Sequence, residues 1–188
     1  MSILATAIAL QAVLLAYHQV TTLFDFYPFN GIRGSSRRER MLEAATNFVF
    51  MAFPLVAFVL RRPGLMQGGV YTYCFILLGE CATWWIPYFF GPSPKWLEIY
   101  SRVQGTTIIV LPRRGTNPVP NLEHLILMTL TLVAAAATYL AYKSRYPGPL
   151  ANLAWAWLGG AFFFAGMVYM MTLAGRKKSL RLAKCDTE

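Results

Sequence analysis

The sequence predicts an all-α integral membrane fold, a bundle of five transmembrane helices with a short cytoplasmic interfacial helix. Only 13% of the 188 residues are charged, while 56% are apolar, and the mean hydropathy is +0.45. A soluble domain carries about 25% charged residues. The apolar residues also gather in five separate runs, each close to the roughly 20 residues that cross a bilayer as a helix. We therefore expect lipid to be the solvent for most of the chain.

The five runs are separated by loops that hold most of the charged residues. They cover about residues 3–24, 41–60, 69–90, 122–142 and 152–175. These runs are too long and too uniformly apolar to be the alternating strands of a barrel. The first run follows no Lys or Arg and is longer than the apolar core of a signal peptide, so we expect it to be retained. The chain is thus predicted to form one five-span domain, 1–175, followed by a basic tail, 176–188.

The distribution of Lys and Arg predicts how the bundle is oriented. In chain order the four loops hold four, two, four and two basic residues, and the tail holds five. Because Lys and Arg accumulate on the cytoplasmic side, the first loop, the third loop and the tail are predicted to be cytoplasmic. The N-terminus then lies on the non-cytoplasmic side. The same distribution explains the net charge of +9 without a nucleic-acid partner, which we do not expect.

The third loop is the longest and contains a further predicted helix. Within residues 94–104, apolar and aromatic side chains recur at helical spacing, and Glu98 and Arg102 form an i,i+4 pair. A short helix with one apolar face is typical of a segment that lies at the membrane interface. Residues 106–111 are predicted to be extended, and residues 112–118, which contain two prolines and a glycine, to form turns.

Polar residues inside the spans predict a layer where chemistry could occur. In span 1, His18 and Asp25 are seven residues apart and share one helical face. His18, Asn47 and Glu80 each lie about 10–12 Å from the predicted cytoplasmic boundary, at 1.5 Å per residue. His124 opens the fourth span. Because ionisable groups within a membrane usually face protein or a cavity, we expect a polar cleft that opens to the cytoplasm.

This cleft supports a leading hypothesis about function. We expect an enzyme or a binding protein that acts on an amphiphilic or lipid-like substrate with an anionic head. The candidate proton-handling, catalytic residues are Glu80, His18 and His124. The candidate substrate-binding residues are Asn47, Glu43, Asp25, Trp84, Arg113 and Arg114. The expected partners are membrane lipids and an amphiphilic small molecule, and the sequence indicates no particular cofactor.

Simpler roles exist for several of these side chains. Glu43 and Glu123 lie in first helical turns, where the helix dipole favours negative charge, and Asn121 is a suitable N-cap. His18 can be a neutral core histidine, and Glu80 can be a protonated structural carboxyl. No metal site is expected, because the sequence has no HxxxH, ExxH or CxxC motif. It also has no nucleophile elbow and no phosphate-binding glycine loop.

Two other classes of function stay open. Glu80 could serve as the proton-coupling carboxyl of a transporter or transporter subunit, although no internal repeat of the kind common in carriers is present. The chain could also be a non-catalytic accessory or assembly subunit. A proton-flux assay separates a carrier from an enzyme, and co-purification with a larger complex favours the accessory role.

The orientation generates a direct prediction. Cysteines introduced singly into residues 31–40 should be protected from an impermeant thiol reagent on intact cells, because that loop is predicted to be cytoplasmic. Cysteines introduced into residues 61–68 or 143–148 should react. The parent chain, labelled in parallel, controls for its native cysteines. Labelling of the 31–40 loop from outside would show that the orientation is reversed.

Overall fold

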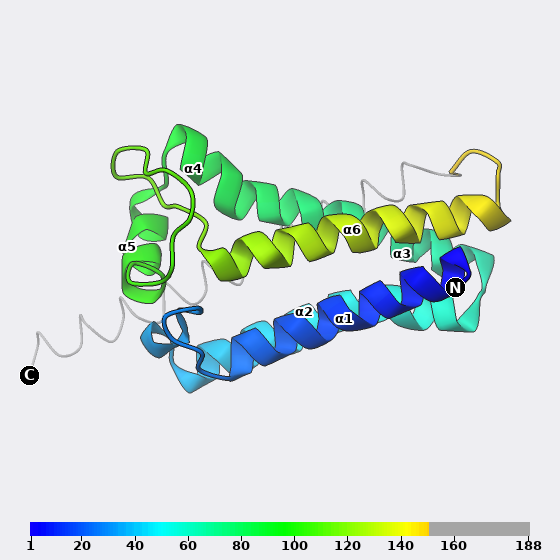
Figure 1. The fold of residues 1–188 in the computed structure, drawn as a ribbon, viewed down its shortest axis with the longest axis horizontal. Helices are drawn as coiled ribbons and strands as arrows, with labels where there is room; N and C mark the ends of the chain where they lie inside the picture. The colour runs from blue at the N-terminus through cyan, green and yellow to red at the C-terminus, as the bar shows by residue number, and fades with distance from the viewer. Residues whose placement is uncertain (151–188) are drawn as a thin grey trace, which may run out of the picture. The chain divides into compact units, whose positions relative to one another are not determined.

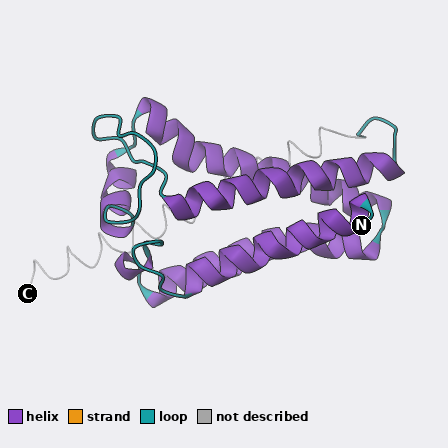
Figure 2. Ribbon diagram, viewed as in Figure 1, coloured by secondary structure: helices purple, strands orange, loops and turns teal. Residues whose placement is uncertain are grey.

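Helices make up nearly all of the ordered secondary structure in the computed structural model, which describes residues 1–150. The predicted fifth span, 152–175, and the basic tail, 176–188, lie outside the described residues. Within residues 1–150 there is no β-strand, and the one β-type pairing is an isolated bridge between Ile109 and Asn121 (Figures 1 and 2). The all-helical fold predicted from the sequence is therefore confirmed for this part of the chain.

Four helical runs correspond to the first four predicted spans. These runs are α1 (Ile3–Leu23), α2 (Arg37–Leu60), α3 (Pro63–Glu80) and α6 (Leu122–Arg145). Helix α3 continues through a π-helical turn, η2 (Cys81–Trp85), into α4 (Ile86–Phe90). The second and third runs begin earlier than predicted, at Arg37 rather than 41 and at Pro63 rather than 69. A 3₁₀ turn, η1 (Ile32–Gly34), and the short helix α5 (Pro94–Val103) complete the elements.

Three of these helices, α1, α2 and α6, are long and apolar enough to cross a membrane. A fourth candidate appears among the described residues only when the run Pro63–Phe90 is counted together with α5, which bends away from it by 102°. The described residues thus contain three, or up to four, helices that are long and apolar enough to span a membrane. The number of five spans and the interfacial position of α5 remain predictions.

Local sequence explains where the helices begin and end. Ser36 and Glu39 form a capping box at the start of α2: the Ser36 hydroxyl accepts from the Glu39 N–H (3.2 Å), and the Glu39 carboxylate accepts from the Ser36 N–H (2.7 Å). This box explains the early start of α2. Arg61 ends that helix in the left-handed region, with φ of 56°. Pro63 then starts α3, where its missing N–H costs no helical hydrogen bond.

The four long helices pack around one another within one compact unit, Met1–Gly148. Helix α1 packs against α2 and α6, and α3 also packs against α2 and α6 (Figure 1). Each of the four contributes one side chain to a buried cluster of Leu14, Met51, Tyr73 and Ala134. A polar contact also crosses the interior, since the buried Gln11 amide donates to the Thr138 hydroxyl (2.8 Å).

Large apolar side chains also cover outward faces of these helices. On α2 they include Phe48, Val49, Val56 and Val59, all exposed. In water such a surface would be an aggregation hazard, whereas hydrocarbon tails solvate it readily. The exposed apolar face of α2 therefore agrees with lipid as the solvent.

Close approach of α2 and α3 depends on a glycine. A Cβ atom at Gly69 would lie 3.2 Å from the Pro54 Cα and 3.4 Å from the Phe58 ring. Small residues permit such backbone approach between membrane helices. Among residues 1–150, Gly79 of the same helix has no atom within 4 Å of the corresponding Cβ position.

We predict that Gly69→Val lowers stability by about 1–3 kcal/mol, the usual cost of overpacking. Gly79→Val is the matched control, because it places the same side chain on the same helix without a neighbour to displace. Thermal unfolding in mild detergent measures both variants. Equal melting temperatures for the two variants would contradict the close packing of α2 on α3.

Candidate functional site

Most of the polar residues singled out in the sequence lie at one end of the helices. We call it the loop end: it is where α1 ends, where α2 and α6 begin, and where residues 24–36 and 91–121 gather (Figure 1). The two loops are joined by backbone hydrogen bonds. The Ile108 N–H donates to the Pro28 carbonyl (3.0 Å), and the Leu122 N–H donates to the Ile108 carbonyl (2.8 Å). The loop end is therefore a connected structure rather than a set of independent turns.

Asn121 fastens the long loop to α6. This fully buried residue caps the helix, because its Oδ1 accepts from the His124 N–H (3.0 Å). Its Nδ2 donates to the Gln104 Oε1 (2.8 Å) and to the Thr107 hydroxyl (3.2 Å). The capping role considered from the sequence is thus present, and the same amide also holds residues 104–107 in place.

Glu123 is buried and His124 half-buried beside this amide. The Glu123 Oε2 lies 3.6 Å from the His124 Nδ1, and Glu123 is only 7% exposed. On α1, the Tyr17 hydroxyl donates to the Glu123 backbone carbonyl (2.9 Å). Glu123 lies in the first turn of α6, where the helix dipole favours its carboxyl. Its backbone carbonyl also joins α6 to α1.

The π-helical turn brings Trp84 against His124. The centroids of the two rings are 4.1 Å apart. Trp84 also meets Trp96 and Tyr100 of α5 edge to face, with centroids at 5.8 and 6.5 Å. Short π-helical turns within α-helices occur frequently at functional sites. Trp84, a predicted binding residue, thus connects the histidine to α5.

His18 lies near the same cluster from α1. It is 6% exposed, and its Nδ1 is 3.4 Å from the Thr22 hydroxyl. Tyr17, the residue before His18, donates to the carbonyl of Glu123, the residue before His124. Two of the three predicted proton-handling residues, His18 and His124, therefore lie on turns of α1 and α6 that are in contact.

Glu80, the third, has a different neighbour from the one expected. Its carboxylate oxygen accepts from the Thr131 hydroxyl of α6 (2.7 Å). The sequence predicted that Glu80 faces His18 and Asn47, but the contacts described for Glu80 run from α3 to α6 instead. Asn47 is half-buried on α2 and has no side-chain hydrogen bond within residues 1–150. Equal depth did not imply contact, because depth leaves the rotation of each helix undetermined.

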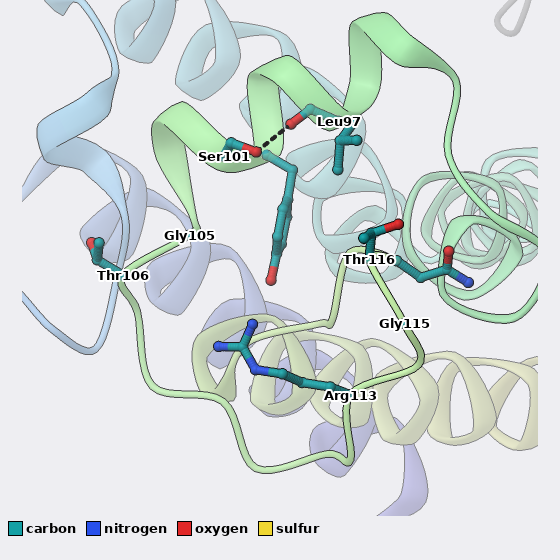
Figure 3. Close-up of a pocket in the computed structure, with 9 residues that line it drawn as sticks. Leu97, Ser101, Gly105, Thr106, Arg113, Gly115 and Thr116 are labelled. Atoms are coloured by element: carbon teal, nitrogen blue, oxygen red, sulfur yellow. Dashed lines mark hydrogen bonds between the residues drawn. The ribbon is translucent and has the colours of Figure 1, made fainter.

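The two predicted arginines have separate surroundings. Arg113 lines a hollow of about 490 Å³ between α5 and the loop that follows it. Leu97 and Ser101 lie on the helical side, while Arg113, Gly115 and Thr116 lie on the loop side (Figure 3). The remaining lining residues are Tyr100, Gly105, Thr106 and Asn117. Arg114 instead lies over the Tyr88 and Phe89 rings, 5.5 and 4.9 Å from their centroids.

The remaining predicted binding residues, Asp25 and Glu43, lie outside this hollow. The Asp25 carboxylate accepts from Arg33 Nε (2.7 Å) and from the Tyr27 N–H (3.0 Å). The hydrogen bond from Arg33 is the main reason why the pKa of Asp25 lies below its usual value. Glu43 is exposed on α2. Their binding roles stay predictions.

Several residues of the loop end carried no distinctive signal in the sequence. Tyr100 donates to the Val119 carbonyl (3.2 Å) and lines the hollow, while Thr107 and Gln104 bind Asn121. Tyr100 belongs to the helical pattern of residues 94–104, whereas Gln104 and Thr107 are common residue types at or beyond the end of that helix, so spacing alone did not select them. Within residues 1–150, no group of three or more His, Cys, Asp or Glu side chains is arranged to hold a metal ion.

Comparison with known proteins gives no match to a family model, to a curated protein or to a solved structure. The class of protein therefore follows from the fold itself. The long apolar helices and the apolar face of α2 are those of a helical integral membrane protein. At the loop end, this membrane protein carries a buried Glu123 beside a half-buried His124, and a hollow lined by Arg113.

The contact between Glu80 and Thr131 can be tested by stability. Glu80→Gln should change stability little, because an amide oxygen can also accept from the Thr131 hydroxyl. Thr131→Val should cost about 1 kcal/mol, because it removes the described partner of the carboxyl. Thermal unfolding in detergent compares the two variants. A larger loss for Glu80→Gln than for Thr131→Val would contradict a purely structural hydrogen bond.

Proposed function

We propose that this membrane protein binds an amphiphile with an anionic head at the loop end, as a binding protein or as a small enzyme. The observation that carries the proposal is the hollow beside Arg113, whose lining residue Tyr100 packs on Trp84, the ring that contacts His124. Tyr100 belongs to both parts, since it lines the hollow and packs on Trp84.

The lining of the hollow suits an anionic group. Arg113 supplies a guanidinium that can donate two parallel hydrogen bonds to a phosphate or carboxylate. Ser101, Thr106 and Thr116 add hydroxyls. Glycines at 105 and 115 leave backbone next to the hollow uncovered by side chains. A volume of about 490 Å³ is in the range of small-molecule sites.

The apolar part of the ligand would lie along neighbouring aromatic and aliphatic side chains. Leu97 and Tyr100 belong to the hollow, and Trp96 packs behind them on Trp84. Aromatic residues with a polar edge favour the boundary between hydrocarbon and water. If the predicted orientation holds, the hollow opens towards the cytoplasm, where a charged head group could enter.

Proton-coupled transport is a second candidate, supported by Glu80. This carboxyl contacts a hydroxyl, Thr131, and has no basic partner within residues 1–150. A carboxyl without a counter-ion inside a membrane span is a typical proton carrier. Proton flux into vesicles containing the reconstituted protein, compared with the Glu80→Gln variant, tests this candidate.

The binding proposal predicts a specific effect of Arg113. Arg113→Gln should weaken binding of dodecyl phosphate by about tenfold or more, because a charged hydrogen bond of about 1.5–3 kcal/mol is lost. Arg145→Gln is the charge-matched control, since Arg145 lies in the last turn of α6, away from the loop end. Native mass spectrometry in detergent measures the bound fraction. Equal weakening by both variants would show that only net charge matters.

Arg114→Gln provides a further comparison within the same loop. Because Arg114 lies over Tyr88 and Phe89 rather than in the hollow, its loss should reduce binding less than that of Arg113. Added salt should weaken binding in the wild type, as expected for a partly exposed charge. Failure of dodecyl phosphate to bind in preference to a neutral dodecyl detergent would contradict the proposed function.

A further inference from the structure

The helical run that contains α3 and α4 is longer than the hydrocarbon of a bilayer is thick. Pro63–Phe90 contains the 18 residues of α3, the five of η2 and the five of α4. At 1.5 Å per residue its length is about 42 Å, against about 30 Å of hydrocarbon. If this run is the predicted third span, at least one of its ends lies among lipid head groups. Helix α4 is the end that lies beside α5 and the loops (Figure 1).

Helix α4 places large apolar side chains on its outer surface. Ile86 and Phe89 are about half exposed, and Phe90 is 84% exposed. The Phe89 ring stacks on that of Trp85, with centroids 5.9 Å apart and an angle of 21° between the planes. Aromatic side chains are enriched where hydrocarbon meets the head groups of a membrane. The side chains at the end of α4 are therefore those of a helix end at the membrane boundary.

The loop after α5 holds Arg114 against these aromatic rings. The Arg114 guanidinium lies 5.5 Å from the centroid of the Tyr88 ring and 4.9 Å from that of the Phe89 ring. Two hydrogen bonds keep the loop in this place. The Tyr88 hydroxyl donates to the Pro112 carbonyl (3.0 Å), and the Asn117 amide donates to the Tyr88 carbonyl (3.0 Å). A guanidinium that rests on rings still presents N–H donors along its edge.

The charge of Arg114 has no compensating group within residues 1–150. Arg114 is exposed, and in this part of the chain it makes no ion pair and no hydrogen bond. Arg33 provides a contrast, because it also lies over an aromatic ring, that of Tyr27 (4.3 Å), but is paired with the Asp25 carboxylate (2.7 Å). An uncompensated cation beside an exposed apolar surface is complementary to a phosphate that carries acyl chains.

We propose that the α4 surface, formed by Ile86, Phe89, Phe90 and Arg114, binds an anionic phospholipid of the surrounding bilayer. The Arg114 guanidinium donates to the lipid phosphate, and the acyl chains lie along the three apolar side chains. A phospholipid without a cationic group in its head is preferred, because no second cation then competes with Arg114 for the phosphate. This site goes beyond the proposed function and does not depend on it, since none of the four residues lines the hollow beside Arg113.

Lipid retention tests the site directly. The full chain in mild detergent is mixed with phosphatidylglycerol and phosphatidylcholine of equal acyl chains, and native mass spectrometry measures how much of each stays bound. The wild type should retain more phosphatidylglycerol. Arg114→Gln should lower that retention about fivefold, the effect of one basic residue near an anionic membrane surface. Arg33→Gln removes the same charge from a paired arginine and should lower it less. Equal losses for the two variants, or no lipid preference in the wild type, would overturn the proposal.

The surroundings of α4 in a bilayer provide a second measurement. In a full chain whose native cysteines are replaced by serine, a nitroxide is attached at Phe90→Cys or, for comparison, at Thr106→Cys. Electron paramagnetic resonance in phosphatidylglycerol vesicles measures collisions with oxygen, which concentrates in hydrocarbon, and with a water-soluble nickel complex. The label at position 90 should meet more oxygen and less nickel than the label at position 106. Equal nickel collisions would place α4 in water, and few collisions of either kind at position 90 would show that protein covers it. Either result would overturn the proposal.

The lipid site and the proposed function fail separately. If Arg113→Gln lowers the retention of phosphatidylglycerol as much as Arg114→Gln does, the lipid head lies in the hollow. The α4 site is then wrong, and the proposed function stands. If dodecyl phosphate does not bind in preference to a neutral detergent, but Arg114→Gln still releases phosphatidylglycerol, the proposed function is wrong and the α4 site stands.

Discussion

Two buried amides organise the loop end, and the candidate site depends on them. Asn30 donates to the Thr21 and Phe24 carbonyls, both at 2.7 Å, and accepts from the Phe26 N–H at 2.9 Å. It thereby satisfies carbonyls that the end of α1 leaves unpaired. Asn121 has the corresponding role at the start of α6, where its side-chain oxygen accepts from the His124 N–H. Unpaired backbone groups near a membrane are costly, so the loops must supply partners wherever the helices stop.

These hydrogen bonds hold the loops in place, and side chains from distant parts of the chain are then close to one another. Arg102 of α5 pairs with Glu39 of α2 (3.2 Å) and donates to the Gly34 carbonyl. That contact joins the third loop to the first. Because α5 is held there, its Tyr100 contacts Trp84, and Trp84 in turn packs at a tilt against His124. The position of the arginine-lined hollow thus depends on contacts made several residues away from it.

The middle of the helices and the loop end are built on different principles. In the middle, small residues such as Gly69 and Ala134 allow close packing, and isolated polar pairs such as Gln11 and Thr138 cross between helices. At the loop end, polar groups are numerous and share partners, as Asn121 does with Gln104, Thr107 and the His124 N–H. A ligand with an apolar chain and a polar head would find matching surroundings in these two regions.

The sequence by itself determined the class of fold and the positions of the long helices, because apolar runs of membrane length leave a chain few alternatives to a helix. The first residue of a helix was harder to predict from apolar character. Helix α2 begins at Arg37, before its apolar run, because a capping box stabilises its polar first turn. Only the tertiary structure decided which polar residues meet. His18 and His124 lie on contacting turns of α1 and α6, whereas Glu80 accepts from Thr131. Spacing along one helix gives depth and face, but the rotation of each helix depends on how all of them pack together.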